Sequence, residues 1–159
     1  MAILEIIKYP NPILRKKCEE IREVTEEIKK LSREMIEVMV KGQGVGLAAS
    51  QVGELKRVII VQLEKGPEVF INPKIIKKSK ETEIGEEGCL SFPGLFLKIK
   101  RKKEIEIEAL NEKGEKIHLK TEGLPARIFQ HEIDHLDGIL IIDKINFWQR
   151  LKLKYGFGR

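Results

Sequence analysis

Apolar and polar residues follow a helical period early in this chain. Between Thr25 and Gly42, apolar side chains recur three and four positions apart, which places them on one face of a helix: Ile28, Leu31, Met35, Val38 and Met39. Thr25 is a suitable N-cap, and the acidic Glu26 and Glu27 suit the positive end of the helix dipole. We expect a helix that ends at Lys41 and Gly42 and packs its apolar face on the core from outside.

The middle of the chain follows the shorter period of β-strands. We expect strands at 57–63 and 69–72, the second ended by Asn72-Pro73. Residues 104–110 alternate between polar and apolar, residues 111–114 (NEKG) favour a turn, and 116–120 alternate again. These three segments predict an antiparallel hairpin with one buried face.

A second helix is predicted to begin at Leu124-Pro125-Ala126 and to end at Gly138. Leu124, Ile128 and Leu136 are expected to pack it against the sheet. The apolar segment 139–145 indicates a short strand or an extended chain, and the tail after it favours a helix.

The remaining landmarks of the chain indicate structure and not function. Pro10 and Pro12 forbid a regular helix near the N-terminus and favour an extended segment with a turn. Cys18 lies among charged residues, and we expect no functional role for it. His118 belongs to a hairpin strand and is expected at the surface or partly buried, not as a ligand.

Composition favours one thermostable cytoplasmic domain. With 159 residues, of which 42% are hydrophobic, residues 1–159 are expected to form a single domain. The 35% charged fraction and the scarcity of Asn and Gln are typical of proteins from heat-loving organisms. We expect no membrane segment, because no apolar run is long enough and no secretion signal is recognisable. The two cysteines indicate no disulfide framework, which favours the cytoplasm.

The net charge of +5 is concentrated at the C-terminus. Residues 144–159 contain no acidic residue and five basic ones: Lys144, Arg150, Lys152, Lys154 and Arg159. The rest of the chain balances 25 basic against 25 acidic residues. This distribution predicts a local basic site for a partner and argues against a protein that coats nucleic acid over its whole surface. We expect no sequence-specific nucleic-acid binding.

The segment QHEIDHLDG (130–138) offers the chemistry of a metal hydrolase. His131 and His135 are four positions apart in the predicted helix, so both imidazoles can hold one metal ion. Glu132 can then reach a water molecule at that ion as a general base. The alternative is a solvated polar helix face that happens to contain two histidines.

Two other segments carry candidate groups. Cys89, in the turn-rich EEGCLSFPG (86–94), is a candidate third ligand that would leave a fourth position free, although a lone cysteine is more often a small buried side chain. The glycine-rich segment 42–53 fits neither a Walker loop nor a dinucleotide fingerprint, and by itself favours a tight turn. Within it, Gln51 offers an amide donor.

In order and spacing, GVGLAASQ (44–51), EGCLS (87–91) and QHEIDHLDG (130–138) closely resemble the three signature motifs of peptide deformylases. The resemblance implies a metal-dependent hydrolase that removes the formyl group from the N-terminal formyl-methionine of new polypeptides and releases formate. The implied fold is α+β, with mostly antiparallel sheets around a central helix that carries HExxH. The implied metal is one divalent ion, usually Fe²⁺, with Zn²⁺ or Ni²⁺ able to replace it.

The resemblance also implies roles for individual residues. The implied metal ligands are Cys89, His131 and His135. Glu132 is the implied proton carrier, and the Gln51 side-chain amide and the Leu90 backbone N–H form the implied oxyanion hole. Candidate substrate contacts are Val45, Gly46, Glu87, Gly88, Leu124, Arg127 and Ile128.

The expected substrate site has further detail. Gly44 and Gly46 are expected to let an extended peptide add to a strand edge. Arg127 is expected to line the methionine pocket with its stem and to hold its charge at the rim. Glu87 and Arg101 are expected to form a structural ion pair.

Two departures and two alternatives remain. Phe96 stands where some family members carry an arginine near the peptide path, and the basic tail, which in bacterial relatives docks on the ribosome, is short. A zincin-like metallopeptidase is disfavoured because no histidine follows His135. A non-catalytic, metal-stabilised module that binds ribosomes would leave Glu132 and Gln51 without a role.

Overall fold

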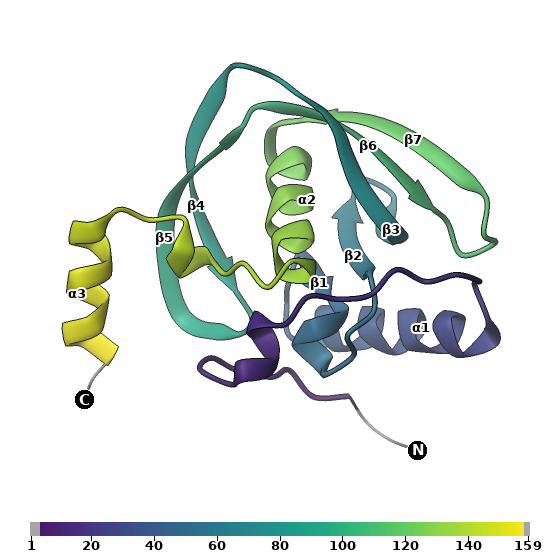
Figure 1. Ribbon diagram of the computed structural model, residues 1–159, viewed down its shortest axis with the longest axis horizontal. Helices are drawn as coiled ribbons and strands as arrows, with labels where there is room; N and C mark the ends of the chain where they lie inside the picture. The colour runs from purple at the N-terminus through teal and green to yellow at the C-terminus, as the bar shows by residue number, and fades with distance from the viewer. Residues whose placement is uncertain (1–3, 158–159) are drawn as a thin grey trace.

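The chain folds around a five-stranded antiparallel sheet (Figure 1). The structure, a computed structural model, describes residues 4–157. The strand order in the sheet is β1 (Gly46–Ala48), β2 (Val58–Leu63), β3 (Gly66–Lys78), β6 (Glu104–Leu110) and β7 (Lys116–Glu122). A two-stranded sheet pairs β4 (Thr82–Cys89) with β5 (Phe92–Lys102). The expected α+β class with mostly antiparallel strands is confirmed.

The first helix has the bounds that its pattern predicts. In α1 (Glu26–Lys41), Thr25 is the N-cap and Gly42 the C-cap, and the Thr25 Oγ1 accepts a hydrogen bond from the Ile28 N–H at 3.4 Å. Ile28, Leu31, Met35 and Met39 are buried, and Val38 packs beside them only partly buried. This face packs against β1 and β2.

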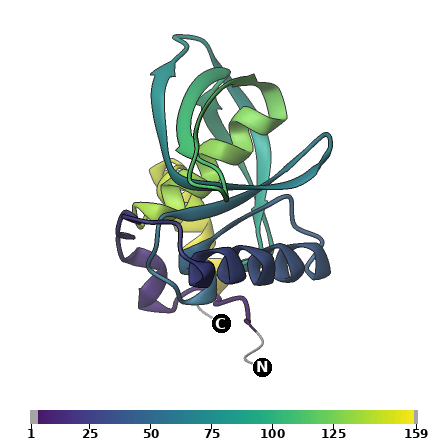
Figure 2. The same cartoon turned by 90° about the vertical axis from the view of Figure 1, so that its right-hand side faces the viewer.

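Strand β2 is buried on both faces because it lies between α1 and the helix α2 (Gly123–Leu136), as Figure 2 shows. Val58 and Ile60 pack in the cluster with α1, whereas Ile59 and Val61 pack in the cluster with α2. Side chains of a strand alternate between its faces, so a strand between two helices must be apolar throughout. This explains the unbroken VIIV run at the start of β2.

Strand β3 continues past Asn72-Pro73, so the predicted strand end at residue 72 is wrong. Asn72 adopts a φ of 51°, and the pairing of β3 with β6 shifts its register between Ile71 and Lys74. A β-bulge at this point accommodates Pro73, which lacks an N–H, where the ladder is already interrupted. The Asn72 side chain is fixed by hydrogen bonds to both backbone groups of Ile21, at 2.8 and 2.7 Å.

Strands β4 and β5 were not predicted, and they continue β3 and β6 as one long ribbon (Figure 1). The Ser79 N–H donates to the Glu104 carbonyl, and the Lys103 N–H donates to the Glu81 carbonyl, which connects the two paired regions. The ribbon curves past α2 and brings the end of β4 close to this helix. The segment around Cys89 is therefore the tip of a hairpin and not only a turn-rich loop.

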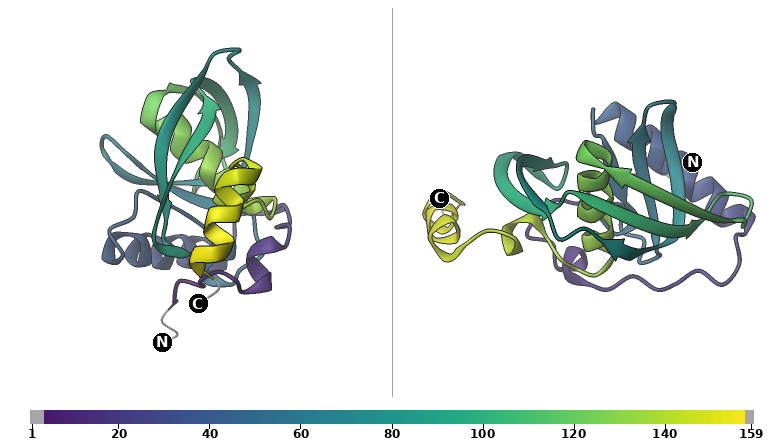
Figure 3. Two further views of the ribbon diagram at one scale, coloured as in Figure 1. Left: turned by 90° about the vertical axis from the view of Figure 1, so that its left-hand side faces the viewer. Right: turned by 90° about the horizontal axis from the view of Figure 1, so that it is seen from above.

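Helix α2 is central, between the five-stranded sheet and the β4–β5 ribbon (Figure 3). Ile128 and Leu136 are buried against the sheet as predicted, and the Phe129 ring meets Phe70 edge to face at 4.7 Å between centroids. Leu124 was also expected to pack against the sheet. This expectation is wrong, because 63% of its surface is exposed and it lies at the mouth of a cavity.

The N-terminal segment is irregular as expected, with one short 3₁₀ turn, η1 (Pro12–Arg15). Cys18 is buried, and it belongs to the apolar core that α2 shares with the sheet. His118 is exposed on β7 beside Glu106, in agreement with the expectation for it.

The segment 139–145 forms no strand, which corrects the strand alternative for it; it contains the 3₁₀ helix η3 (Ile141–Asp143). The Asp143 carboxylate accepts a hydrogen bond from the Leu140 N–H at 2.9 Å and pairs with Arg15 and Arg150. These side-chain bonds, one of them to the distant Arg15, replace strand pairing, while Leu140 and Ile141 are buried.

The predicted C-terminal helix is present as α3 (Phe147–Phe157), which lies beyond the β4–β5 ribbon (Figure 3). Two aromatic side chains of this helix are largely exposed: 73% of the Trp148 surface and 69% of the Phe147 surface. Of the basic residues in this tail, the Lys154 side chain and Arg159 lie outside the part that the structure describes. Among residues 4–157, no helix is both long and apolar enough to cross a membrane.

Candidate metal centre and active site

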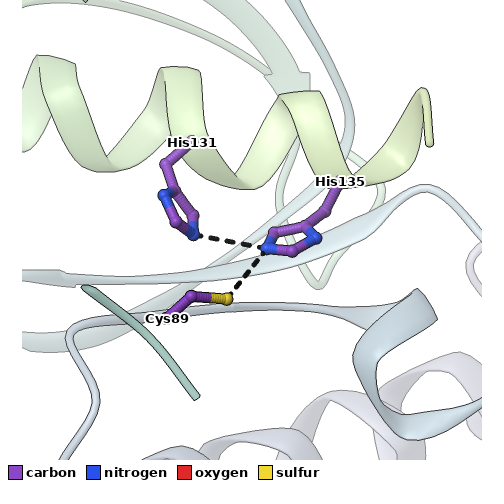
Figure 4. A group of neighbouring side chains, drawn as sticks. All are labelled: Cys89, His131 and His135. Atoms are coloured by element: carbon purple, nitrogen blue, oxygen red, sulfur yellow. Dashed lines mark hydrogen bonds between the residues drawn. The ribbon is translucent and has the colours of Figure 1, made fainter. Parts of the chain in front are cut away.

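Three ligand-type side chains converge where the end of β4 meets α2 (Figure 4). The His135 Nε2 lies 3.4 Å from the Cys89 Sγ and 3.3 Å from the His131 Nε2. All three ligand atoms lie within 4.8 Å of one another. One α-helical turn separates the two histidines, and the hairpin tip supplies the cysteine from a distant part of the sequence.

The orientation of His131 is set by Glu87, which lies two residues before Cys89 on β4. The His131 Nδ1 and the Glu87 Oε1 are 2.9 Å apart. A carboxylate in this position accepts the Nδ1–H and turns the Nε2 toward the other two ligands, where a cation can take the place of the Nε2 proton. A carboxylate that orients a histidine in this way is a regular feature of protein metal sites.

Glu87 is itself held as a buried carboxylate by Arg101 on β5. The Arg101 Nε donates to Glu87 Oε2 and its Nη2 donates to Glu87 Oε1, each at 2.9 Å. Burial raises the pKa of Glu87, but the bonds with Arg101 and His131 outweigh burial and lower this pKa to about 2. The expected Glu87–Arg101 ion pair is confirmed.

Arg127 does not hold its charge at a pocket rim, and this expectation is wrong. Its Nη1 donates to Glu87 Oε2 at 2.7 Å and to the Ile99 carbonyl at 2.8 Å, and its Nη2 donates to the Glu83 carbonyl at 2.7 Å. The guanidinium is buried because it faces a carboxylate and two carbonyls inside the protein. Arg127 still lines the cavity described below.

Glu132 points at the same centre from α2. Its Oε1 lies 3.9 Å from the His131 Nε2, and burial raises the pKa of the Glu132 carboxyl to about 7. Burial lowers the pKa of His131, but the negative charge of Glu132 and contacts with Cys89 and Glu87 outweigh burial and raise it to about 10. Burial, together with the charge of His131, lowers the pKa of His135.

These residues fit a divalent cation. Two imidazole Nε2 atoms and one sulfur lie within 4.8 Å of one another, an arrangement in which one cation would satisfy all three. Among the described residues, Glu132 Oε2 and His135 Nδ1 are buried without a hydrogen-bond partner. Buried polar atoms are rarely left unpaired, so the free Glu132 Oε2 beside the three ligand atoms is further reason to expect a ligand here.

Gln51 approaches the centre from the segment that follows β1. It lies in the 3₁₀ turn η2 (Ala49–Val52), which follows the edge strand β1. Its Oε1 accepts the Ala48 N–H at 3.0 Å, and its Nε2 donates to Ser91 Oγ at 3.0 Å and lies 3.4 Å from Cys89 Sγ. Its amide nitrogen therefore faces the space beside the three ligand atoms.

A cavity of about 440 Å³ opens onto this centre. It lies between the segment before β1, the β4–β5 hairpin and α2, and its lining includes all seven candidate substrate contacts as well as Leu90 and Phe96. Val45, Phe96 and Leu124 are each more than half exposed at its mouth. The cavity is thus apolar at its entrance and carries the polar residues at its inner end.

The chain is similar in sequence and in structure to known peptide deformylases. Residues 3–151 match the sequence profile of the polypeptide deformylase family. The chain is 45% identical to a peptide deformylase of Desulforudis audaxviator, over 91% of this chain and 94% of that one. The crystal structure of peptide deformylase from Thermotoga maritima superposes with a TM-score of 0.89 at 44% identity, covering 92% of this chain and 99% of that one.

The chain belongs to the peptide deformylase family. A peptide deformylase from Synechococcus elongatus, solved in complex with actinonin, has a TM-score of 0.91 at 35% identity and covers 98% of this chain and 86% of that one. The predicted family, fold and hydrolase class are therefore confirmed. Neither the metallopeptidase nor the non-catalytic alternative is supported by these relatives.

Within this deformylase site, sequence reasoning missed Ser91 and gave Arg127 a different role. Ser91 orients the Gln51 amide, and Arg127 shares Glu87 with Arg101. Arg127 precedes His131 by four positions, so a helical projection places both on one face of α2. That spacing could have indicated that the same carboxylate binds both.

Proposed function

We propose that this chain hydrolyses the formamide bond of N-formyl-methionyl polypeptides and releases formate, with one divalent metal ion held by Cys89, His131 and His135. The convergence of these three ligand atoms beside Glu132 and Gln51 carries the proposal. When bound there, a divalent ion acts as a Lewis acid and makes water a nucleophile at neutral pH. The remaining chemistry belongs to the residues around the ligands.

Glu132 is the proposed proton carrier. Its carboxylate is buried next to the ligand atoms, and its Oε2 accepts no hydrogen bond from the described residues. This oxygen is therefore free to accept a proton from the attacking water and to return it to the leaving amine. General acid–base catalysis by a positioned carboxylate typically contributes about 10²–10⁴-fold to the rate.

Gln51 and Leu90 are the proposed oxyanion donors. The Gln51 amide has two hydrogens: its Nε2 donates to Ser91 Oγ at 3.0 Å and to Cys89 Sγ at 3.4 Å. The second hydrogen is proposed to turn from the sulfur to a substrate oxygen beside Cys89. Leu90 follows Cys89 directly, which places its backbone N–H next to the same point. Two fixed donors of this kind stabilise the negative oxygen that develops as water adds to the formyl carbon.

The peptide is proposed to bind along the free edge of β1. Among the residues that the structure describes, this strand pairs only with β2, and the Val45 carbonyl accepts the Gln62 N–H on that side. Because backbone groups alternate in direction along a strand, those of Gly46 face the open edge and the cavity. The methionine side chain would then lie in the apolar part of the cavity, beside Val45, Leu124 and Ile128.

The test is formate release from formyl-Met-Ala-Ser, with acetyl-Met-Ala-Ser as the control substrate. We expect release by the wild-type protein and a loss of about 100-fold or more for Glu132→Gln, which keeps the shape of the side chain. Cys89→Ser should lose bound metal together with activity. Failure of the metal-loaded wild type to release formate would reject the proposed function.

Fe²⁺ is the proposed natural metal, with Zn²⁺ and Ni²⁺ as substitutes. One thiolate and two imidazoles accept any of these ions, so the ligand set supports the class and the family resemblance supports iron. Elemental analysis of protein purified without oxygen tests this. Activity that is lost in air with iron, but kept with nickel, would agree with an oxygen-sensitive ferrous enzyme.

Ribosomes are the proposed partner of α3, and the cytoplasm the proposed location, because the substrates are newly made polypeptides. The basic residues of the tail and the exposed Phe147 and Trp148 support a contact with an acidic surface. Cosedimentation with ribosomes should be lost in high salt and on deletion of residues 147–159. Binding that survives both changes would contradict this role.

A further inference from the structure

Arg127 occupies an unusual place for a residue of the cavity wall, because its charge is turned away from the cavity. Its guanidinium makes three hydrogen bonds inside the protein, to Glu87, to the Ile99 carbonyl and to the Glu83 carbonyl. These acceptors lie on both strands of the β4–β5 ribbon. Arg127 therefore fastens α2 to the ribbon at three points.

Gly85 makes this contact possible. A Cβ on Gly85 would lie 2.9 Å from the Arg127 Cζ and 3.0 Å from its Nε and Nη2, so the guanidinium rests directly on the backbone of β4. Any larger residue at this position would displace it. The position of the Arg127 guanidinium thus depends on a glycine at residue 85.

Glu87 is the centre of this arrangement. Its Oε2 receives hydrogen bonds from Arg127 and Arg101, and its Oε1 contacts Arg101 and the His131 Nδ1. The two guanidinium groups neutralise and orient the Glu87 carboxylate. This carboxylate in turn orients His131, one of the three candidate metal ligands. Arg101 donates to both Glu87 oxygens, and Arg127 adds a second donor at Oε2, so the loss of Arg127 removes one of the bonds that hold this carboxylate against His131.

We propose that Arg127 is a positioning residue of the metal centre: through Glu87 it orients His131, and through the β4 backbone it sets the place of Cys89 relative to both histidines. This deepens the proposed function, since it names a determinant of metal affinity at the same site. It replaces the expectation that Arg127 mainly shapes the methionine pocket. Those two roles have different consequences for metal binding and for substrate binding.

The deciding measurement is the affinity of metal-free protein for Zn²⁺, determined by competition with a chelating dye. Arg127→Met keeps the apolar part of the side chain and removes the guanidinium. We expect this variant to bind Zn²⁺ at least about 10-fold more weakly than wild type. The absorption bands of the Co²⁺-loaded protein, which report ligand geometry, should change as well. Neither readout needs an active enzyme, so inactivity of the wild type would count only against the proposed function.

A double-mutant cycle tests the route through Glu87. If Arg127 acts on the metal through this carboxylate, Arg127→Met should weaken Zn²⁺ binding much less in a Glu87→Gln background than in wild type. Full additivity of the two changes would overturn the route through Glu87. An unchanged Zn²⁺ affinity of Arg127→Met, combined with a raised KM for formyl-methionyl peptides, would overturn the whole proposal, because that is the result expected of a simple pocket wall.

A matched control separates positioning from general stability. Arg57 is another largely buried arginine that fastens α2, with its Nη1 bound to Asp137 and to the Leu136 carbonyl, but it does not touch Glu87. Arg57→Met should lower thermal stability and leave the Zn²⁺ affinity within about two-fold of wild type. An equal loss of affinity in both variants would overturn the proposal.

Gly85→Ala provides a milder second variant should Arg127→Met not fold. It keeps Arg127 but forces the guanidinium away from the β4 backbone. We expect it to weaken Zn²⁺ binding and to shift the Co²⁺ bands in the same direction as Arg127→Met. Wild-type values for Gly85→Ala would contradict the arrangement inferred here.

Discussion

Gly46 of the edge strand β1 lies directly against Glu132 of the central helix. A Cβ on Gly46 would be 2.5 Å from the Glu132 Oε1 and 2.9 Å from its Cγ. The proposed peptide-binding edge and the proposed proton carrier are thus in contact, and only a glycine at residue 46 leaves room for the Glu132 carboxylate. The backbone that would receive the substrate also limits where the carboxylate can move.

Gly46→Ala should therefore reduce formate release strongly without removing the metal. The added methyl group must displace either the Glu132 carboxylate or β1, and a misplacement near 1 Å can cost about 100-fold in rate. We expect a loss of that size in kcat/KM, measured at saturating metal. Gly44→Ala should lose less, because its Cβ would meet the movable end of the Leu90 side chain. Near-normal turnover of Gly46→Ala would show that the contact is unimportant.

Gln51→Ala should lower kcat more than it raises KM. Removal of one well-placed oxyanion donor typically reduces kcat by about 10²–10³-fold. Ser91→Ala, which removes the hydroxyl that orients the amide at 3.0 Å, should produce a smaller loss in the same parameter. Steady-state kinetics and metal analysis of both variants measure this. A change confined to KM would assign Gln51 to substrate binding alone.

Removal of the metal should lower the melting temperature. An ion that binds only the folded protein stabilises it by about 2.7 kcal/mol at a concentration 100 times its Kd. For a chain of this size, that corresponds to a shift of roughly 5–10 °C. Calorimetry of chelator-treated protein with increasing Ni²⁺ should show the increase, and Cys89→Ser should show less of it. A melting temperature independent of Ni²⁺ would argue against binding at this centre.

Met35→Ala should destabilise the protein and leave its chemistry intact. Met35 is fully buried on α1, on the sheet face opposite α2. Loss of a buried methionine side chain typically costs about 2–5 kcal/mol of unfolding free energy. Denaturant unfolding should show this, while kcat at 25 °C should stay close to wild type. The exposed Val40 of the same helix serves as the control, since Val40→Ala should change stability by less than about 0.5 kcal/mol.

Several elements could be predicted because neighbouring residues determine them. The period of α1 with its Thr25 cap, the β6–β7 hairpin, and the one-turn spacing of His131 and His135 all depend on short stretches of chain. The continuation of β3 past Pro73 and the 3₁₀ turn at 141–143 could not be predicted in this way. At Pro73, a β-bulge lets the strand continue past a residue that normally ends it. At 141–143, the bond of Asp143 to the distant Arg15 accompanies a turn where the apolar sequence allowed a strand.

The sequence by itself determined the family, through three short motifs, and the helix that presents two candidate ligands and Glu132. Only the tertiary structure decided what surrounds them. Cys89 lies 46 positions from His135 along the chain, and its sulfur reaches that histidine only because the β4–β5 ribbon curves past α2. The buried position of the Arg127 charge has the same origin, since a guanidinium turns inward only where the fold has placed a carboxylate and free carbonyls to receive it.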